Sequence, residues 1–136
     1  MSSAEIASVI DRYIDAWRRG DADGVMRLFA RDAVLMPHDG IEPRIGHEAI
    51  RAFWFTPSRA VSGIDEFRFD LRGTTQFQHH ALTWGSRVLQ YWQGIGADKV
   101  TYRWTGTVLI ALQRRDTSWE ITHFMWDDPP PERVTG

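Results

Sequence analysis

The sequence predicts an α+β fold, with helices from the first part of the chain packed on one face of a mostly antiparallel sheet. Three observations lead to this prediction. Apolar residues recur at helical spacing between residues 6 and 17, whereas apolar and charged residues alternate between residues 66 and 72. Beyond residue 80, three long strand-like runs are separated by short turn segments. Helices followed by a meander of strands favour a single α+β domain.

The first predicted helix begins at the N-terminus, where Ser2 and Glu5 have the spacing of a capping box. Gly20 ends this helix, and Asp21 or Asp23 can cap a second, short helix. The first helix carries one continuous apolar stripe, which predicts that this side is buried. The stripe consists of Ile6, Val9, Ile10, Tyr13, Ile14 and Trp17.

A short buried strand and a third helix are predicted next. The apolar run 33–36 is stopped by Pro37, and residues 37–46 contain two prolines and two glycines, which predicts a loop. The third helix, about residues 47–55, buries Ile50, Phe53 and Trp54 and ends before Pro57.

The remaining strands are predicted around Phe67, Phe69 and Leu71 and at about 81–93, 100–113 and 118–127. Turns at 94–98 and 115–118 connect the last three. Residues 1–128 then form one domain. A proline-rich tail follows at 129–136, and we expect it to be extended and mobile because prolines cannot continue a strand ladder.

Composition excludes several classes of function. The chain has 136 residues, a formal net charge of −2 and scattered basic residues, so no electrostatic footprint for nucleic acid is present. It has no cysteine, which excludes disulfides and thiolate chemistry. No apolar run is long enough to span a membrane, and the N-terminus does not resemble a signal peptide. We therefore expect a cytoplasmic protein without a membrane contact.

Two segments resemble a known superfamily. Residues 10–54, IDRYIDAWRRGDADGVMRLFARDAVLMPHDGIEPRIGHEAIRAFW, resemble the ketosteroid isomerase branch of the NTF2-like (SnoaL-like) superfamily. Residues 105–128, TGTVLIALQRRDTSWEITHFMWDD, are similar to the end of many SnoaL-like proteins. The resemblance implies an NTF2-like cone, in which a strongly bent, mostly antiparallel sheet wraps three N-terminal helices and leaves a deep apolar cavity.

The resemblance also indicates which catalytic groups of the isomerases this sequence keeps and which it lacks. Tyr13 falls at the position of the tyrosine that donates a hydrogen bond to the substrate oxyanion. Pro37 replaces the proton-shuttling aspartate, and Trp54 replaces a tyrosine of the hydrogen-bond network. The stretch 104–107 offers no acid for the second oxyanion donor. The chain therefore lacks the acid–base pair of the steroid isomerases.

His38 and Asp39, directly after Pro37, are the candidate replacements for that base. Adjacent residues on an extended segment point to opposite sides, so we do not expect these two to bond to each other. The alternative is a solvated polar turn. A limonene-epoxide-hydrolase-like site is a weaker match, because Arg103 is followed by Thr105 instead of an aspartate and only Asp127 could supply an acid.

We expect an aromatic-lined pocket for a small apolar molecule. Alternation along the last strand places His123 and Met125 on the face of Trp119 and Ile121. No metal or cofactor is expected, because His79 and His80 lack further ligands at metal spacing. The predicted lining is Tyr13, Trp17, Leu35, Pro37, Trp54, Trp104, His123 and Met125.

Two kinds of function follow. One is an isomerase, cyclase, dehydratase or hydrolase acting on an apolar compound, with Tyr13, His38 and Asp39 as its catalytic residues. The alternative is a non-catalytic ligand-binding or dimerisation domain. Because both sheet faces are apolar, we expect a homodimer that buries the outer face. The residues behind this expectation include Trp84, Trp92, Phe124 and Trp126.

Overall fold

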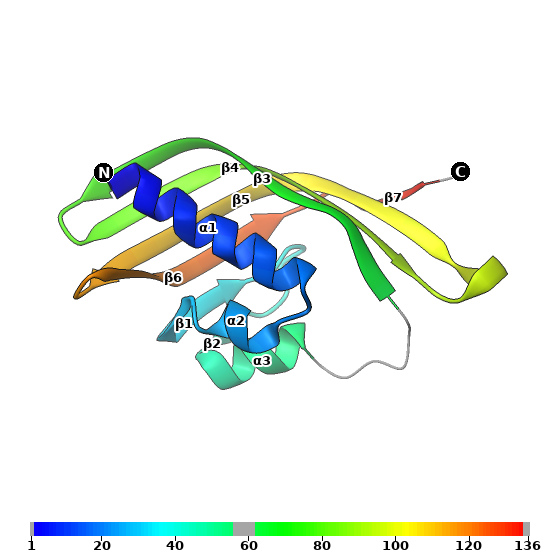
Figure 1. Cartoon of the computed structure of the whole chain (residues 1–136), viewed down its shortest axis with the longest axis horizontal. Helices are drawn as coiled ribbons and strands as arrows, with labels where there is room; N and C mark the ends of the chain where they lie inside the picture. Colours follow the sequence, from blue (N-terminus) through cyan, green and yellow to red (C-terminus); the bar gives the residue numbers. More distant parts are fainter. Residues whose placement is uncertain (1, 56–61, 135–136) are drawn as a thin grey trace.

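A strongly curved, open sheet and three helices on one side of it make up the molecule (Figure 1). The computed structural model describes residues 2–55 and 62–134. The helices are α1 (Ser2–Arg18), α2 (Ala22–Met26) and α3 (His47–Trp54), and a 3₁₀ turn, η1, spans Gly96–Asp98. The strands are β1 (Phe29–Met36), β2 (Arg44–Ile45), β3 (Ser62–Phe77), β4 (His80–Gln93), β5 (Val100–Arg115), β6 (Ser118–Asp127) and β7 (Glu132–Val134).

The sheet has the strand order β2-β1-β6-β5-β4-β3, and β7 pairs separately with β5. Strands β3 to β6 form an antiparallel meander, whereas β1 pairs in parallel with β6. The α+β prediction and the NTF2-like cone are therefore confirmed. Helix α1 lies along the inner face of the meander, and α2 and α3 lie beside β1 and β2 (Figure 1).

The predicted apolar stripe of α1 is the side of the helix that is buried. Ile6, Val9 and Ile10 are almost fully inaccessible, and Tyr13 is 3% exposed. At the other end, Asp21 caps α2 by accepting a hydrogen bond from the backbone N–H of Gly24 at 2.9 Å. Local sequence signals therefore place the first two helices correctly.

Three local predictions were wrong. Strand β1 begins at Phe29, four residues before the predicted start, and the loop after it contains the two-residue strand β2. The proline-rich tail does not run free. Residues 132–134 form β7 and pair with residues 101–103 of β5, beyond the point where β6 ends. Prolines 129–131 thus separate two strands that share the same neighbour.

A β-bulge in β6 changes which side chains face the helices. Ile121 pairs with Leu112 and His123 pairs with Ala111, so Thr122 is an extra residue in the ladder. The strict alternation that we assumed breaks at this point, because one extra residue exchanges the two faces. As a result, Phe124 and Trp126 face the inner side and are buried, whereas His123 and Met125 are exposed on the outer side.

Two tryptophans on the outer face of β4 cover glycines of the neighbouring strand. Trp84 pairs with Gly73, and Trp92 pairs with Gly63. A Cβ added at either glycine would lie within 2.7 Å of the paired indole, so the absence of a side chain is what lets the ring lie against the backbone. These pairs give Trp84 and Trp92 a structural role on the outer face.

In the described parts of the chain, none of the helices has the length and apolar character needed to cross a bilayer.

Candidate functional site

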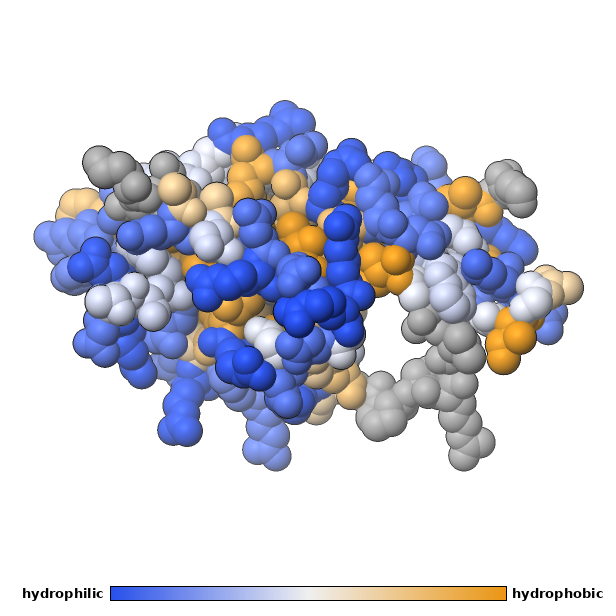
Figure 2. Space-filling model, in the orientation of Figure 1, coloured by the Kyte–Doolittle hydropathy of each residue, from blue (hydrophilic) through white to orange (hydrophobic). Residues whose placement is uncertain are grey.

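A cavity of about 720 Å³ lies between α1, α3 and the inner face of strands β3 to β6. On the helix side of the molecule the surface is mostly hydrophilic, with hydrophobic residues visible beside the C-terminal end of α1 (Figure 2). Nine of the eighteen lining residues are aromatic. The lining residues are Tyr13, Trp17, Arg18, Arg19, Gly20, His38, Trp54, Phe55, Gly63, Ile64, Phe67, Arg87, Leu89, Tyr91, Trp104, Phe124, Trp126 and Asp128.

Tyr13 lies at the centre of the aromatic wall. Its ring is 5.1 Å from the ring of Phe124 and 5.7 Å from that of Phe69, measured between centroids. Burial raises the pKa of the Tyr13 phenol far above its ordinary value, because the phenolate would lose its hydration. The nearby Arg87 cation opposes this rise only in part. Tyr13 is therefore a neutral phenol at physiological pH and can donate a hydrogen bond.

Trp17, Trp54 and Phe55 form the side of the cavity next to the helices. The rings of Trp17 and Phe55 stack at 4.8 Å, and Trp54 meets Trp17 edge to face at 5.3 Å. Arg18 links this side to the sheet by donating a hydrogen bond to the backbone carbonyl of Phe67 at 3.1 Å. The helical wall is thus fixed against strand β3.

His38 lines the cavity from the loop after β1, and its ring lies between those of Trp104 at 5.6 Å and Trp126 at 5.8 Å. Its Nδ1 is 2.9 Å from Oδ2 of Asp39. Because a carboxylate only accepts, Nδ1 must carry the hydrogen, and Nε2 of the neutral ring is then the free basic atom.

The expectation that His38 and Asp39 would diverge was wrong. It assumed an extended backbone, but Asp39 has φ +59° and lies in a turn closed by a hydrogen bond from Ile41 N–H to the His38 carbonyl. The left-handed conformation of Asp39 turns its carboxylate back toward the preceding imidazole. Asp39 remains largely solvated, with 70% of its side chain exposed.

A buried ion pair, which the sequence did not reveal, also borders the cavity. Arg87 of β4 donates to Oδ2 of Asp128, just after β6, with Nη1 at 2.6 Å, and the two side chains are 9% and 1% exposed. The Arg87 guanidinium also lies over the rings of Phe67 and Trp126, at 5.8 and 5.7 Å. Desolvation raises the pKa of Asp128 above its ordinary value, and the charge and the hydrogen bond of Arg87 oppose that rise.

One sequence signal could have pointed to this pair. Alternation along β4 puts Arg87 on the same face as Ala81, Thr83 and Gly85, all of which are buried. An arginine on the buried face of a strand requires a partner, because an unpaired charge there is very costly. The identity of the partner could not be read, since Asp128 is 41 residues away.

The other predicted site residues fall into three groups. Tyr13, Trp17, Trp54 and Trp104 line the cavity. Leu35 and Pro37 are buried but are not among the lining residues. The placement of His123 and Met125 in the pocket was wrong, because the β6 bulge turns both outward.

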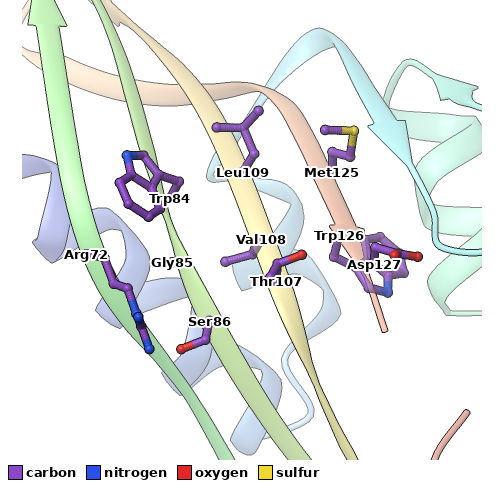
Figure 3. Close-up of a pocket in the computed structure, with 10 residues that line it drawn as sticks. All are labelled: Arg72, Trp84, Gly85, Ser86, Thr107, Val108, Leu109, Met125, Trp126 and Asp127. Carbon is purple, nitrogen blue, oxygen red and sulfur yellow. The ribbon is translucent and has the colours of Figure 1, made fainter. Parts of the chain in front are cut away.

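The residues considered for an epoxide-hydrolase-like site lie on the outer face. Arg103 donates to Glu66 Oε1 at 2.8 Å and to Gln90 Oε1 at 3.0 Å. Asp127 is exposed and borders a groove on the same face (Figure 3). Arg103 and Asp127 therefore do not line the inner cavity. Within residues 2–55 and 62–134, no cluster of three or more His, Cys, Asp or Glu side chains is arranged to hold a metal ion.

Comparison with known proteins places this geometry in a family. The model of the SnoaL-like domain family matches residues 10–126. A conserved protein from Planctomyces limnophilus superposes with a TM-score of 0.77 at 15% identity, covering 98% of both chains. A ketosteroid isomerase-like protein from Erwinia carotovora atroseptica gives 0.74 at 18% identity, covering 94% of this chain and 96% of that one. A hexachlorocyclohexane dehydrochlorinase gives 0.68 at 13% identity, covering 99% and 90%.

Proposed function

The chain belongs to the SnoaL-like domain family, and on that premise we propose that it is an enzyme that moves a proton on a small, largely apolar molecule bound in the inner cavity. The single observation that carries this proposal is the composition of the cavity wall. Its nine aromatic side chains include a neutral phenol, Tyr13, and they are joined by an imidazole, His38, whose Nδ1 is held by a carboxylate.

The size and lining of the cavity support a small apolar ligand. Pockets for such ligands enclose about 300–1,000 Å³ and combine apolar walls with a few polar groups. The cavity, at about 720 Å³, lies within this range. Two structurally similar proteins have names that refer to a ketosteroid and to hexachlorocyclohexane, both of which are compact, apolar ring compounds.

The proposed chemistry divides between two residues. His38 takes a proton from a substrate carbon through Nε2, while Asp39 holds Nδ1–H. Tyr13 donates a hydrogen bond to the substrate oxygen on which negative charge develops, and the buried surroundings strengthen that bond. Return of the proton to a different carbon completes an isomerisation, whereas departure of a leaving group completes an elimination.

Hydrogen–deuterium exchange tests this proposal without knowledge of the natural substrate. The protons next to the carbonyl of 2-tetralone, and of an unconjugated steroid ketone, exchange with D₂O when a base removes them, and NMR follows the rate. We expect wild-type protein to accelerate the exchange. Tyr13→Phe should reduce the acceleration by about 10²–10³-fold, because one oxyanion donor contributes roughly 3 kcal/mol to the barrier.

Two further variants complete this experiment. His38→Gln should remove most of the acceleration, whereas Tyr102→Phe is the matched control, because Tyr102 is not among the lining residues of the cavity. Normal melting temperatures must accompany all three variants. Full exchange activity in both Tyr13→Phe and His38→Gln would contradict the assignment.

The second candidate function is non-catalytic binding of the same kind of molecule. Two points favour it. The resemblance to the isomerases puts Pro37 at the position of their base, and the carboxylate that holds His38 is mostly solvated. Binding of 2-tetralone without accelerated exchange would select this alternative.

We also propose that the chain is a homodimer that pairs through the outer face of the sheet. Trp84, Leu109 and Met125 form a row across β4, β5 and β6, and each is 37–49% exposed (Figure 3). Arg72 and Asp127 flank this row on β3 and β6. A two-fold axis parallel to the strands, between β4 and β5, would bring each Arg72 near Asp127 of the partner subunit. Phe124 and Trp126, which were expected on this face, are on the inner one.

A further inference from the structure

The buried Arg87–Asp128 pair has one donor and one acceptor that form no hydrogen bond within the described residues. Nη1 of Arg87 contacts Oδ2 of Asp128 at 2.6 Å. Nε of Arg87 and Oδ1 of Asp128 are both buried and have no hydrogen-bond partner among residues 2–55 and 62–134. The pair therefore holds one unsatisfied buried donor and one unsatisfied buried acceptor beside the cavity, and each such group is costly.

The local structure keeps space for this carboxylate. Gly106 pairs with Arg87 across β5 and β4, so both residues face the inner side of the sheet. A Cβ on Gly106 would overlap Oδ1 of Asp128 and the backbone oxygen of Asp127. Gly106 thus lets Asp128 fold back over β5 and approach Arg87.

From this geometry we propose that the Arg87–Asp128 pair is a hydroxyl-binding subsite, and that the molecule bound in the cavity carries an alcohol or phenol group. A hydroxyl donates one hydrogen bond and accepts others. It can donate to Asp128 Oδ1 and accept from Arg87 Nε, which satisfies both unused atoms. A ketone or ether oxygen only accepts and would leave the carboxylate oxygen unpaired.

Charge and position favour a neutral group at this end of the cavity. Arg87 and Asp128 neutralise each other. A ligand carboxylate or ammonium would therefore be buried without an unpaired opposite charge to compensate it. The rings of Trp126 and Phe67 lie over the guanidinium, and only 9% of the Arg87 side chain is exposed. Hydrogen bonds in such a setting discriminate strongly, because an analogue without the hydroxyl leaves a buried charge unsatisfied.

This inference rests on the proposed binding of a small molecule in the cavity, and not on the proposed proton transfer. The test therefore uses calorimetric titration with three probes of nearly equal shape: 2-naphthol, 2-methoxynaphthalene and naphthalene. We expect wild-type protein to bind 2-naphthol at least tenfold more tightly than 2-methoxynaphthalene, since only the former donates a hydrogen bond.

Asp128→Asn is the decisive variant, because it keeps the shape and an oxygen for Arg87 but turns the second acceptor into a donor. We expect the preference for 2-naphthol over 2-methoxynaphthalene to fall below threefold. Asp127→Asn is the matched control. Asp127 is adjacent in sequence but faces the outer groove, so this change should leave the preference intact (Figure 3).

A measurement on the wild-type protein tests the subsite even if Asp128→Asn does not fold. The backbone amide resonances of Gly106 and Asp128 should shift more with 2-naphthol than with 2-methoxynaphthalene. Equal affinities for these two probes, or a preference that survives in Asp128→Asn, would overturn the subsite and leave cavity binding standing. Failure of all three probes to bind would overturn both.

Discussion

Two arginine–carboxylate pairs lie on opposite faces of the same sheet and have opposite electrostatic surroundings. Arg87–Asp128, on the inner face, is almost completely buried, whereas Arg103–Glu66, on the outer face, leaves about one third of each side chain exposed. Burial raises the pKa of Asp128. A hydrogen bond from Arg103 lowers the pKa of Glu66, which stays near water.

This contrast teaches which of two chemically similar pairs can serve a site. A solvated pair exchanges its bonds with water at little cost, so it contributes little specificity. In a buried pair, each donor or acceptor without a hydrogen bond costs free energy. A ligand that supplies the missing hydrogen bonds therefore binds more tightly. The two faces of one sheet therefore provide a recognition surface on the inside and a solvated charge network on the outside.

The largest expected difference between the pairs is in stability. Arg87→Ala leaves Asp128 as a buried carboxylate without its cation, and breaking a buried pair in this way costs about 3–5 kcal/mol. Urea unfolding at about pH 8 measures this loss in the free energy of unfolding. Arg103→Ala, the control on the outer face, should unfold close to wild type. Similar losses in the two variants would contradict the comparison.

The second expected effect is the loss of the proposed dimer when a charge is placed on the apolar part of the outer face. Leu109 lies in the middle of the row formed with Trp84 and Met125, so Leu109→Lys should turn the proposed dimer into a monomer with an unchanged circular dichroism spectrum. Sedimentation velocity at micromolar concentration distinguishes the two states. Ile95→Lys is the control, because Ile95 is 72% exposed but lies beside η1, away from that row. A wild-type monomer would refute the dimer directly.

The same two faces show what could be predicted from the sequence. The stripe on α1 and the alternation in β3 depend only on nearby residues, so helix and strand assignments there were correct. Tyr13 and Trp17 belong to that stripe, and both line the cavity. Local periodicity was thus sufficient for the part of the site that comes from α1.

The remaining site residues depend on contacts that local patterns do not contain. The bulge at Thr122 is set by the pairing of β6 with β5, and it exchanged the predicted faces of His123 and Phe124. Asp128 meets Arg87 only because the sheet brings residues 41 positions apart together. The His38–Asp39 contact depends on a positive φ at one residue, which sequence alone seldom specifies outside glycine.

The smallest expected effect is a difference in how the two pairs respond to pH. The pKa of Asp128 is higher in the folded protein than in the unfolded chain, so the folded state binds this proton more tightly. Its contribution to the free energy of unfolding must therefore fall as pH rises from the unfolded pKa, near 4, through the folded value. Glu66 behaves in the opposite way. Its lowered pKa contributes stability above the unfolded value, and that contribution is lost as pH falls through the folded value.

Urea unfolding of wild type, Asp128→Asn and Glu66→Gln between about pH 3 and pH 8 separates these contributions. The free energy of unfolding of wild type minus that of Asp128→Asn should decrease as pH rises. The corresponding difference for Glu66→Gln should increase over the acidic part of the range. The slope with pH is the quantity compared, because each substitution also adds a pH-independent offset by changing its ion pair. Parallel slopes for the two variants would show that burial does not separate the two faces in the way described.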